Sequence, residues 1–539
     1  MFEPSHHRFQ LGALVVGIGC WVVQVPGAFA ASPMQDCKQL ASIKIPATTI
    51  VSAEAVEAGA FKPPEGTAFP ALQPFCRVVA VGKPSKDSEI RFEVWLPASG
   101  WNGRFWASGN GGFAGAIPYD GLAQRVAEGY ATAGTDTGHQ GRNGVDAAWA
   151  SGHPEKVIDF GYRAIHEVTA SAKRIVAAFY GQSPTHSYFS WCSNGGRQAL
   201  MEAQRYPDDY DGIIAGAPAY DWTHLFTGVA WMQFIWLEEK SGYFSASKLP
   251  AIQSAALAAC DGVDGVKDLV IDDPQRCTFD PSGLRCQGPE TDACLTQPQL
   301  TALRKIYADA VLAGGTRLIR GLSPGAEAEP GSWQAWVTGA AGKKGLDFLF
   351  AVGFFRDFVF GKPDWDFHSF NPDRDGRLAD QELASILNAT DPDLGKFARR
   401  GGKLILYHGW NDPVIPALST VDYYEQVMNK LGPKTTDASV RLFMVPGMLH
   451  CDGGPGPNDF GQDAGGTGDP AHMVGAALQR WVEQGIAPEQ IIASKHKNDD
   501  DPTSQVVRTR PLCAYPRGAH YRGTGNTDNA SSFECVVAP

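Results

Sequence analysis

Ser190-Trp191-Cys192-Ser193-Asn194-Gly195-Gly196 joins a predicted strand at 187–191 to a predicted helix at 196–206. Apolar residues at helical spacing predict another helix over 155–181, before this strand. Other short apolar runs indicate strands at 90–96, 104–107, 211–215, 403–407 and 440–445, and a late amphipathic helix is expected at 473–484. Strands that alternate with helices favour a mainly parallel sheet covered by helices.

The turn at Ser193 carries a chemical signal of its own. A serine on a sharp turn from strand to helix is typical of the nucleophile elbow of α/β-hydrolases. Such a turn is strained and needs small neighbours, which Gly195 and Gly196 supply. The helix that follows directs its N-terminus at the serine and favours negative charge that develops there. The competing interpretation is an ordinary glycine-rich loop between a strand and a helix.

Two later segments supply the partners that such a serine requires. An elbow hydrolase carries its nucleophile, its acid and its histidine in that chain order, each after a strand. Asp412 follows the strand at 403–407, and His450 follows the strand at 440–445. We predict that Ser193 attacks an acyl carbonyl, that His450 accepts its proton and that Asp412 orients the imidazole. Taken singly, Asp412 could be a turn carboxylate and His450 a surface histidine.

The alternation of strands and helices stops near residue 221 and resumes at residue 403. We therefore predict a catalytic domain formed by 31–221 and 385–539, with a lid domain inserted at 222–384. The lid falls between the predicted nucleophile and the predicted acid, and its aromatic residues could line a cleft for an aromatic ligand. Most of them are expected to form the core of the lid itself. They are Trp222, Phe226, Trp231, Phe234, Trp236, Trp333, Trp336, Phe354 and Phe355.

Composition and the N-terminus restrict where the protein works. The 539 residues are 43% hydrophobic and 19% charged, which favours a large folded core. The formal net charge of −12 disfavours binding to nucleic acids. Residues 1–30 hold Arg8, an apolar run at 11–25 and the small-residue site Ala28-Phe29-Ala30, which together predict a secretory signal peptide. An anchoring helix is the competing interpretation, but the apolar run is short for one. We expect an exported protein, periplasmic or secreted, that does not stay in the membrane.

The cysteine count agrees with an oxidising compartment. Removal of the signal peptide would remove Cys20 and leave ten cysteines, an even number that predicts five disulfides. Metal binding by thiolates would favour CxxC pairs, and the sequence has none. Cys192 directly precedes Ser193 and Cys451 directly follows His450, so contact between the serine and the histidine would also bring these cysteines together. Spacing alone does not prove connectivity, although three close pairs look like local loop staples: Cys260/Cys277, Cys286/Cys294 and Cys513/Cys535.

Cys192-Ser193, Asp412 and His450-Cys451 together resemble the CS–D–HC pattern of the tannase/feruloyl esterase family, which includes mono(2-hydroxyethyl) terephthalate hydrolase. The similarity extends over the mature chain, through Gly109-Asn110-Gly111-Gly112 to the C-terminal cysteines. One position departs from the family, which usually has glycine where this chain has Trp191. The resemblance implies an α/β-hydrolase fold with a large inserted lid domain.

The resemblance also implies particular site residues. An oxyanion hole is expected from the backbone N–H of Asn194 and from that of Gly111 or Gly112. Two donors of this kind are worth about 3 kcal/mol each when they are removed singly. The implied disulfides are Cys37–Cys76, Cys192–Cys451, Cys260–Cys277, Cys286–Cys294 and Cys513–Cys535.

An acidic segment of the insert indicates a cation. Asp261, Asp264 and Asp268 bring carboxylates together on a glycine-containing loop, where they repel one another unless a hard cation lies among them. The resemblance implies a structural Ca²⁺ bound by these side chains and by the carbonyls of Val266 and Val270; a solvated acidic turn is the alternative. The segment 371–382 also fits an EF-hand pattern, although its Asn371-Pro372 start is poor, and the sequence leaves open whether it binds a second Ca²⁺. No organic cofactor is expected.

We therefore expect a secreted serine carboxylesterase that hydrolyses small aromatic-acid esters through an acyl-enzyme. Plant-wall hydroxycinnamate esters, which include esters attached to polysaccharide, are the first expectation. Gallate esters, as for a tannase, and terephthalate half-esters are the alternatives. Two further classes stay open from the sequence: a calcium-stabilised binding protein with an inactive hydrolase fold, and a thiol enzyme that uses Cys192.

Overall fold

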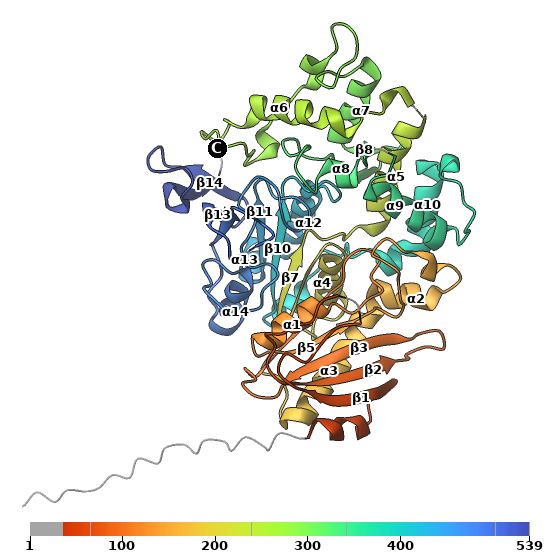
Figure 1. Ribbon diagram of the computed structural model, residues 1–539, viewed down its shortest axis with the longest axis vertical. Helices are drawn as coiled ribbons and strands as arrows, with labels where there is room; N and C mark the ends of the chain where they lie inside the picture. Colours follow the sequence, from red (N-terminus) through yellow and green to blue (C-terminus); the bar gives the residue numbers. More distant parts are fainter. Residues whose placement is uncertain (1–35, 65, 239, 341, 502, 538–539) are drawn as a thin grey trace, which may run out of the picture.

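The computed structural model describes residues 36–64, 66–238, 240–340, 342–501 and 503–537 (Figure 1). The predicted signal peptide at 1–30 lies outside the described residues. Within them, no helix is both long enough and apolar enough to cross a membrane.

A nine-stranded sheet forms the centre of the molecule, in the order β1-β2-β3-β5-β4-β6-β7-β10-β11. From β5 to β11 neighbouring strands are parallel, whereas β1, β2 and β3 continue the sheet as antiparallel strands. The sheet is thus mainly parallel, as the sequence predicts. The strands are β1 (Thr48–Val56), β2 (Phe75–Gly82), β3 (Ile90–Pro97), β4 (Arg104–Ser108), β5 (Ala131–Thr135), β6 (His186–Cys192), β7 (Gly212–Gly216), β10 (Lys403–Gly409) and β11 (Val440–Val445).

The central strands are apolar along their whole length because helices cover both faces of the sheet. Successive side chains of a strand point to opposite faces. Leu404 and Leu406 accordingly pack in the core under α3, α4 and α12, while Ile405 and Tyr407 pack in the core under α14. The helices outside the insert are α1 (Tyr119–Ala127), α2 (Pro154–Ile158), α3 (Ala164–Tyr180), α4 (Asn194–Arg205), α11 (Gly395–Arg399), α12 (Ala417–Leu431), α13 (Pro433–Ser439) and α14 (Val474–Gln484).

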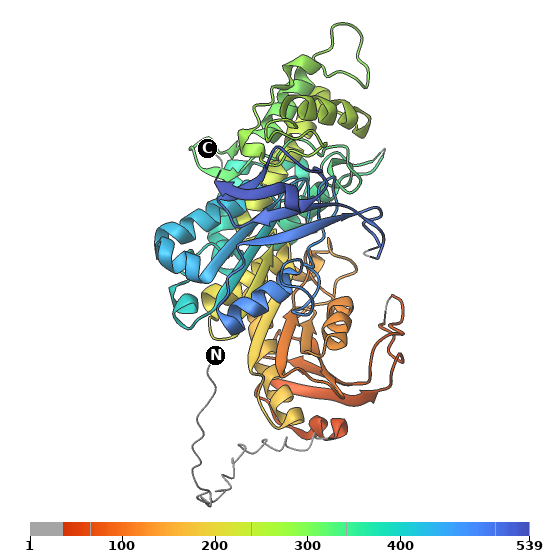
Figure 2. The ribbon, with the colours of Figure 1, turned by 90° about the vertical axis from the view of Figure 1, so that its left-hand side faces the viewer.

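The residues between β7 and β10 pack in a second hydrophobic core, which also includes Phe113, Val157 and Phe160 from outside this insert. None of the described residues of the insert belongs to a strand of the large sheet. This insert lies at one end of the molecule, and β1 to β3 lie at the other (Figures 1 and 2). The limits of the lid domain, 222–384, stay a prediction. The insert holds α5 (Trp222–Glu238), α6 (Leu249–Cys260), α7 (Gln297–Tyr307), β8 (Ala310–Val311), β9 (Arg317–Ile319), α8 (Trp333–Trp336), α9 (Leu346–Gly353) and α10 (Pro372–Leu387).

The poor EF-hand match at 371–382 falls on a helix. Asn371 caps α10 by accepting a hydrogen bond from the backbone N–H of Arg374 at 2.9 Å. Asp373 and Asp375 stand in the first turn of this helix, where a negative charge is stabilised by the free backbone N–H groups. The acidic residues at the start of this segment are therefore typical of the N-terminus of a helix.

The C-terminal region adds two strand pairs, and disulfides tie the chain at five places. The strand pairs are β12 (Gln490–His496) with β13 (Val506–Cys513), and β14 (Arg517–Tyr521) with β15 (Phe533–Val537). All five predicted disulfides are confirmed: Cys37–Cys76, Cys192–Cys451, Cys260–Cys277, Cys286–Cys294 and Cys513–Cys535.

Candidate active site

Ser193 lies on the turn between β6 and α4 in an unusual backbone conformation. Its φ is 66° and its ψ is −123°, a left-handed region that costs energy for a residue with a side chain. The turn is held by the Ser193 N–H, which donates to the carbonyl of Gly216 at 2.9 Å. The carbonyl of Ser193 accepts from the N–H of Arg197 at 3.1 Å, so the serine stands directly at the start of the helix.

The turn leaves no room for a side chain at Gly195 or Gly196. A Cβ on Gly196 would lie 2.3 Å from the carbonyl oxygen of Gly216. A Cβ on Gly195 would lie 2.3 Å from the ring of Trp191, the residue that departs from the family pattern. Trp191 also packs against Gly109, where an added Cβ would lie 2.8 Å from the Cβ of the tryptophan. The tryptophan is accommodated because its neighbours are glycines.

Asp412 and His450 meet where two neighbouring parallel strands end. Gly409, the last residue of β10, pairs with Val445, the last residue of β11, so both loops leave the same edge of the sheet. The loops pass so closely that a Cβ on Gly409 would lie 2.4 Å from the carbonyl oxygen of Met448. His450 Nδ1 lies 2.6 Å from Asp412 Oδ2 and donates to it, because an ionised carboxylate can only accept.

The carboxylate of Asp412 is buried and completely satisfied. Oδ1 accepts from the backbone N–H groups of Val414 and Ile415, each at 2.9 Å. Oδ2 accepts from His450 and also from His408 Nε2 at 3.2 Å. Burial alone would raise the pKa of Asp412, but the charge of His450 and the hydrogen bonds of both histidines outweigh it and hold this pKa below its usual range.

His408 is a supporting residue that the sequence analysis did not single out. It is fully buried, and its Nε2 also lies 3.0 Å from the carbonyl of Ile415. Because both neighbours of Nε2 are acceptors, Nε2 carries the proton, and Nδ1 accepts from the Thr420 hydroxyl at 2.7 Å. The only signal in the sequence was its spacing of four residues from Asp412.

A disulfide joins the loop of the serine to the loop of the histidine. Cys192 and Cys451 are bonded, with their Cα atoms 5.9 Å apart and 259 positions of chain between them. Each cysteine is the direct neighbour of a predicted catalytic residue, so the bond restrains Ser193 and His450 relative to each other. The disulfide expected from the positions of Cys192 and Cys451, next to Ser193 and His450 in the chain, is therefore present.

Ser193 and His450 line the same cavity, of about 320 Å³, between the sheet and the insert. The ring of Trp336 lies edge-on to that of His450, with their centroids 5.1 Å apart. Phe350 in turn stacks on Trp336 at 6.2 Å. The other residues that line the cavity are Gly111, Gly112, Trp191, Cys192, Asn194, Ala219, Trp222, Leu225, Phe226, Val414, Ile415, Cys451 and Asp463.

Only some of the predicted aromatic residues reach this cavity. Trp222, Phe226 and Trp336 line it, whereas Trp333, Phe354 and Phe355 are buried in the core of the insert. Phe350 lines the cavity and was not predicted, because α9 is apolar on nearly every face and its sequence does not indicate which residue turns inward.

The predicted oxyanion donors lie beside Ser193 and in the cavity wall. Asn194 begins α4, and its side-chain Oδ1 is held by two hydrogen bonds from Arg197, at 2.7 and 2.9 Å. Arg197 is fully buried between the rings of Phe160 and Trp222, and burial lowers its pKa to about 9. Gly111 and Gly112 both line the cavity. Because Asn194 begins α4, its backbone N–H lies in the first turn of a helix whose N-terminus points toward Ser193.

The predicted calcium ligands lie in the loop after α6. The carboxylate of Asp268 accepts a hydrogen bond from Arg510 and forms an ion pair with Arg508 at 3.2 Å, while its Oδ1 is buried and has no partner among the described residues. Both carboxylate oxygens of Asp272 are also buried without a partner there. Burial, together with the charges of Asp264 and Asp268, raises the pKa of Asp272. The described residues contain no group of three or more His, Cys, Asp or Glu side chains placed to hold a metal ion.

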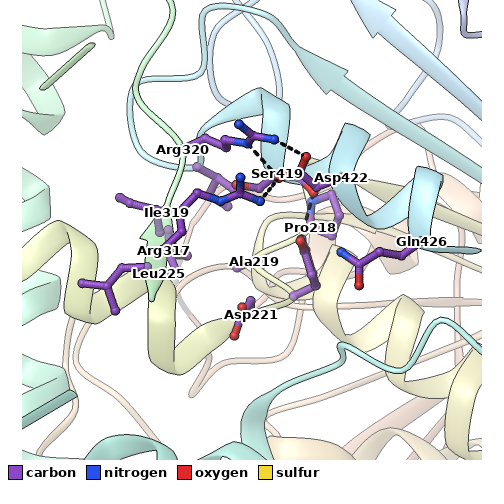
Figure 3. Close-up of a pocket in the computed structure, with 13 residues that line it drawn as sticks. Pro218, Ala219, Asp221, Leu225, Arg317, Ile319, Arg320, Ser419, Asp422 and Gln426 are labelled. Carbon is purple, nitrogen blue, oxygen red and sulfur yellow. Dashed lines mark hydrogen bonds and ion pairs between the residues drawn. The ribbon is translucent and has the colours of Figure 1, made fainter. Parts of the chain in front are cut away.

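A second cavity, of about 110 Å³, is shown in Figure 3. It shares Ala219, Leu225 and Ile415 as a wall with the cavity of Ser193. Its two arginines come from the insert, and both contact Asp422 on α12. Arg320 binds the carboxylate with two hydrogen bonds, at 2.6 and 2.8 Å, and Arg317 adds a third at 2.7 Å (Figure 3).

The sheet order and the serine, aspartate and histidine at its carboxyl edge define an α/β-hydrolase. The family model described as tannase and feruloyl esterase matches residues 76–536. The chain belongs to the tannase and feruloyl esterase family, and it is a carboxylic ester hydrolase.

Relatives from bacteria and fungi resemble almost the whole chain. It is 46% identical over 534 residues to an uncharacterized esterase of Xanthomonas campestris pv. campestris, which covers 94% of this chain and 92% of the relative. It is 34% identical over 467 residues to a probable feruloyl esterase B-1 of Aspergillus flavus, with 86% of each covered. The crystal structure of feruloyl esterase B from Aspergillus oryzae matches with a TM-score of 0.85 at 30% identity, over 93% of this chain and 99% of that one. These similarities confirm the family and the fold predicted from the sequence.

Proposed function

We propose that the protein is a serine esterase that hydrolyses small esters of aromatic acids, with Ser193 as nucleophile, His450 as general base and Asp412 as the orienting acid. One observation carries this proposal. The 2.6 Å contact between His450 and Asp412 stands in the cavity that Ser193 lines, and a disulfide ties the serine loop to the histidine loop.

The mechanism follows from the positions of the protons. His450 donates Nδ1–H to Asp412, which leaves Nε2 to accept the proton of the Ser193 hydroxyl as its oxygen attacks the ester carbonyl. The N–H of Asn194 and that of Gly111 or Gly112 stabilise the oxyanion. The imidazolium then protonates the leaving alcohol, and an acyl-enzyme forms. A water molecule, deprotonated by His450, releases the aromatic acid and restores the hydroxyl of Ser193.

The aromatic wall of the cavity supports an aromatic acyl group. Trp222, Phe226 and Phe350 are buried there, and flat rings pack well against such side chains. Hydroxycinnamate esters, including esters carried by plant-wall polysaccharide, are our first candidate because a similar protein is named a probable feruloyl esterase. Gallate esters are the close alternative and terephthalate half-esters the third. Values of kcat/KM for methyl ferulate, methyl gallate and a terephthalate half-ester will rank them.

Covalent labelling tests the catalytic role directly. A serine-directed aryl phosphonate should label the wild-type protein at Ser193, and Ser193→Ala should abolish both the label and the activity. A wild-type protein that folds but takes no label and releases no acid would instead support a binding protein with an inactive hydrolase fold. Cys192 is held in a disulfide, so the structure gives no support to a thiol enzyme.

We also propose that the insert binds a structural Ca²⁺ through Asp261, Asp264 and Asp268 and through the carbonyls of Val266 and Val270. The support is an acidic loop in which Oδ1 of Asp268 and both carboxylate oxygens of Asp272 are buried and have no hydrogen-bond partner among the described residues. Metal analysis of the purified protein should find one calcium per chain, and chelation should lower its Tm. Asp264→Asn should lose the calcium, whereas Asp373→Asn, on α10, should retain it.

Export is the last part of the proposal. We propose that residues 1–30 are a signal peptide and that the mature protein acts in the periplasm or outside the cell. The five disulfides support an oxidising compartment. N-terminal sequencing of protein from the periplasm and from the medium should give Ala31 as the first residue. Recovery of the full-length chain from the cytoplasm with free thiols would contradict this proposal.

A further inference from the structure

One charged side chain stands among the residues that line the cavity of Ser193. Most of this wall is aromatic, aliphatic or glycine, and its polar members besides Ser193 and Asn194 are His450 and Asp463. Among these lining residues, all of them in the described part of the chain, no lysine or arginine is present. A negatively charged substrate group would therefore find no cationic side chain in this cavity. It would instead be repelled by the carboxylate of Asp463.

The carboxylate of Asp463 is not engaged elsewhere. No hydrogen bond or ion pair joins it to another residue that the structure describes. Partial removal from water raises the pKa of Asp463 most; the charges of Asp452 and Asp459 raise it further, and the charge of Arg125 lowers it. Its charged neighbours are thus mostly of the same sign. Arg125 is itself buried and lies 3.9 Å from Glu128, so part of its charge is already balanced.

The position of Asp463 identifies the part of the substrate that it meets. Trp222, Phe226 and Ile415 are at most 4% exposed and form the inner part of the cavity, whereas the side chain of Asp463 is exposed. If the aromatic acyl group occupies the inner, aromatic part, the alcohol of the ester extends toward the opening. Asp463 then stands beside the alcohol, on the solvent side of Ser193 and His450.

We propose that Asp463 determines the charge preference of the alcohol side, so that esters of neutral alcohols, such as sugar hydroxyls, are hydrolysed faster than esters of alcohols that carry a carboxylate. The inference rests on the esterase function proposed above. Its physical basis is that like charges in a partly desolvated cavity repel more strongly than in water. Such repulsion excludes wrong substrates without any new contact to the right one.

A matched pair of esters isolates this charge. In 5-O-caffeoylquinate the alcohol carries a carboxylate, and in its methyl ester the same alcohol is neutral. At low ionic strength we expect the wild type to release caffeate from the neutral ester with a kcat/KM about tenfold higher. Asp463→Asn, which keeps the shape and removes the charge, should bring the ratio to within about twofold of one. Salt should lower the wild-type ratio, because it screens exposed charges.

Two control variants separate the local charge from general effects. Asp463→Glu keeps the charge and should keep most of the preference. Asp459→Asn removes a nearby acid that is bound to His496 at 2.9 Å and does not line the cavity, and the ratio should stay as in the wild type. A wild-type ratio near one, or a ratio that Asp463→Asn leaves unchanged, would overturn the inference.

A second pair of esters places the charge on the acyl side. Monomethyl and dimethyl terephthalate differ by a carboxylate on the acid part, and Asp463→Asn should change their ratio less than it changes that of the quinate pair. A larger effect on the terephthalate pair would overturn the assignment to the alcohol side.

Binding to Ser193→Ala separates this inference from the proposed function. Titration calorimetry with the two caffeoyl esters measures their affinity ratio without turnover, and Asp463→Asn in the same background should bring that ratio toward one. A wild type that hydrolyses neither ester contradicts the proposed function alone, since the affinity ratio still decides the charge preference. Equal affinities, or no binding of either ester, would overturn the charge preference.

Discussion

The two cavities that share Ala219, Leu225 and Ile415 as a wall differ in how their charged side chains are paired. In the cavity of Figure 3, Arg317 and Arg320 are both bound to Asp422, and each charge has a partner. In the neighbouring cavity Asp463 has no partner among the described residues, and His450 is bound to Asp412 through Nδ1, which leaves Nε2 for the reaction. The ion pairs of Asp422 join the insert to α12, whereas the cavity of Ser193 keeps Nε2 of His450 and the carboxylate of Asp463 available to a substrate.

Of the two cavities, the cavity of Ser193 also contains the residues whose backbone conformation or burial lowers the stability of the fold. Ser193 has a positive φ, a buried carboxylate supports His450, and Asp463 has no partner among the described residues. Such features cost stability and persist only where the surrounding structure enforces them. Here the disulfide between Cys192 and Cys451 and the hydrogen bonds around Asp412 supply that enforcement.

The largest expected effect is the loss of the proposed nucleophile, Ser193. Ser193→Ala should lower kcat by about 10⁶-fold, since no other group can form the acyl-enzyme. The thermal transition should be nearly unchanged, because one hydroxyl is removed and the turn is kept. Ser419→Ala, in the wall of the cavity of Figure 3, is the matched control and should keep activity within about twofold. Equal losses in both variants would break the distinction between the two cavities.

The next effect should come from the buried acid. Asp412→Asn should lower kcat by about 10⁴-fold, because an amide that donates toward the ring favours the wrong histidine tautomer. Asp422→Asn makes the same change in the neighbouring cavity and should cost activity only a few-fold. Steady-state kinetics with one neutral aryl ester compares the two, and a similar loss in both would contradict the assigned roles.

Asp412 also predicts a pH dependence of stability. Its pKa is lowered in the folded protein, so its ionised form stabilises the fold above the unfolded pKa of about 3.9, and this contribution is lost as the pH falls through the lower, folded value. The stability difference between the wild type and Asp412→Asn should therefore be constant at neutral pH and shrink below about pH 4. Denaturant titrations at several pH values measure it; a difference that grows on acidification would show that the sign is wrong.

The disulfide beside the catalytic residues should contribute several kilocalories per mole. Replacing Cys192 and Cys451 together by alanine should lower the free energy of unfolding by about 2–5 kcal/mol, and the lower part of this range is expected because other disulfides already restrict the unfolded chain. Activity should fall as well, since the serine and histidine loops lose their link. The pair Cys286 and Cys294 closes a loop of 8 residues and is the control. Its removal should destabilise less and leave kcat unchanged.

The smallest effect is expected for the paired cavity. Arg320 is partly exposed, and Arg320→Gln should lower the free energy of unfolding by about 1 kcal/mol, because Arg317 still binds Asp422. The value of kcat/KM should stay within about threefold of wild type. A loss of activity comparable to that of Asp412→Asn would show that these ion pairs control the catalytic cavity.

Much of the fold could be predicted because its signals are local. The run at 440–445 was predicted as a strand and is β11 within the same limits, and the run at 403–407 is the first part of β10. Such runs are readable since both faces of a central parallel strand are buried. The helix predicted at 155–181 is instead divided into α2, a π-helical turn at 159–163 and α3. Apolar spacing continues through that turn, and only hydrogen bonding distinguishes it.

The aromatic side chains of the insert were the least predictable part of the site. Phe350 lines the cavity while Phe354, four residues later, is buried in the insert, although both belong to one apolar run. Which face of α9 turns toward Ser193 depends on how the insert packs against the sheet. Asp463 could not be predicted for a related reason. It lies in a glycine-rich loop, and nothing near it in the sequence indicates that it lines the same cavity as Cys451.

The sequence by itself determined the mainly parallel sheet, the family and the chain positions of the proposed serine, acid and histidine, because parallel strands deliver their following loops to one edge of the sheet. Only the tertiary structure decided which side chains surround them: the tryptophan against His450, the second histidine behind Asp412, the paired arginines beyond the shared wall and the free carboxylate at the opening. These contacts join residues far apart in the chain, and burial and pairing of that kind exist only once the insert has packed onto the sheet.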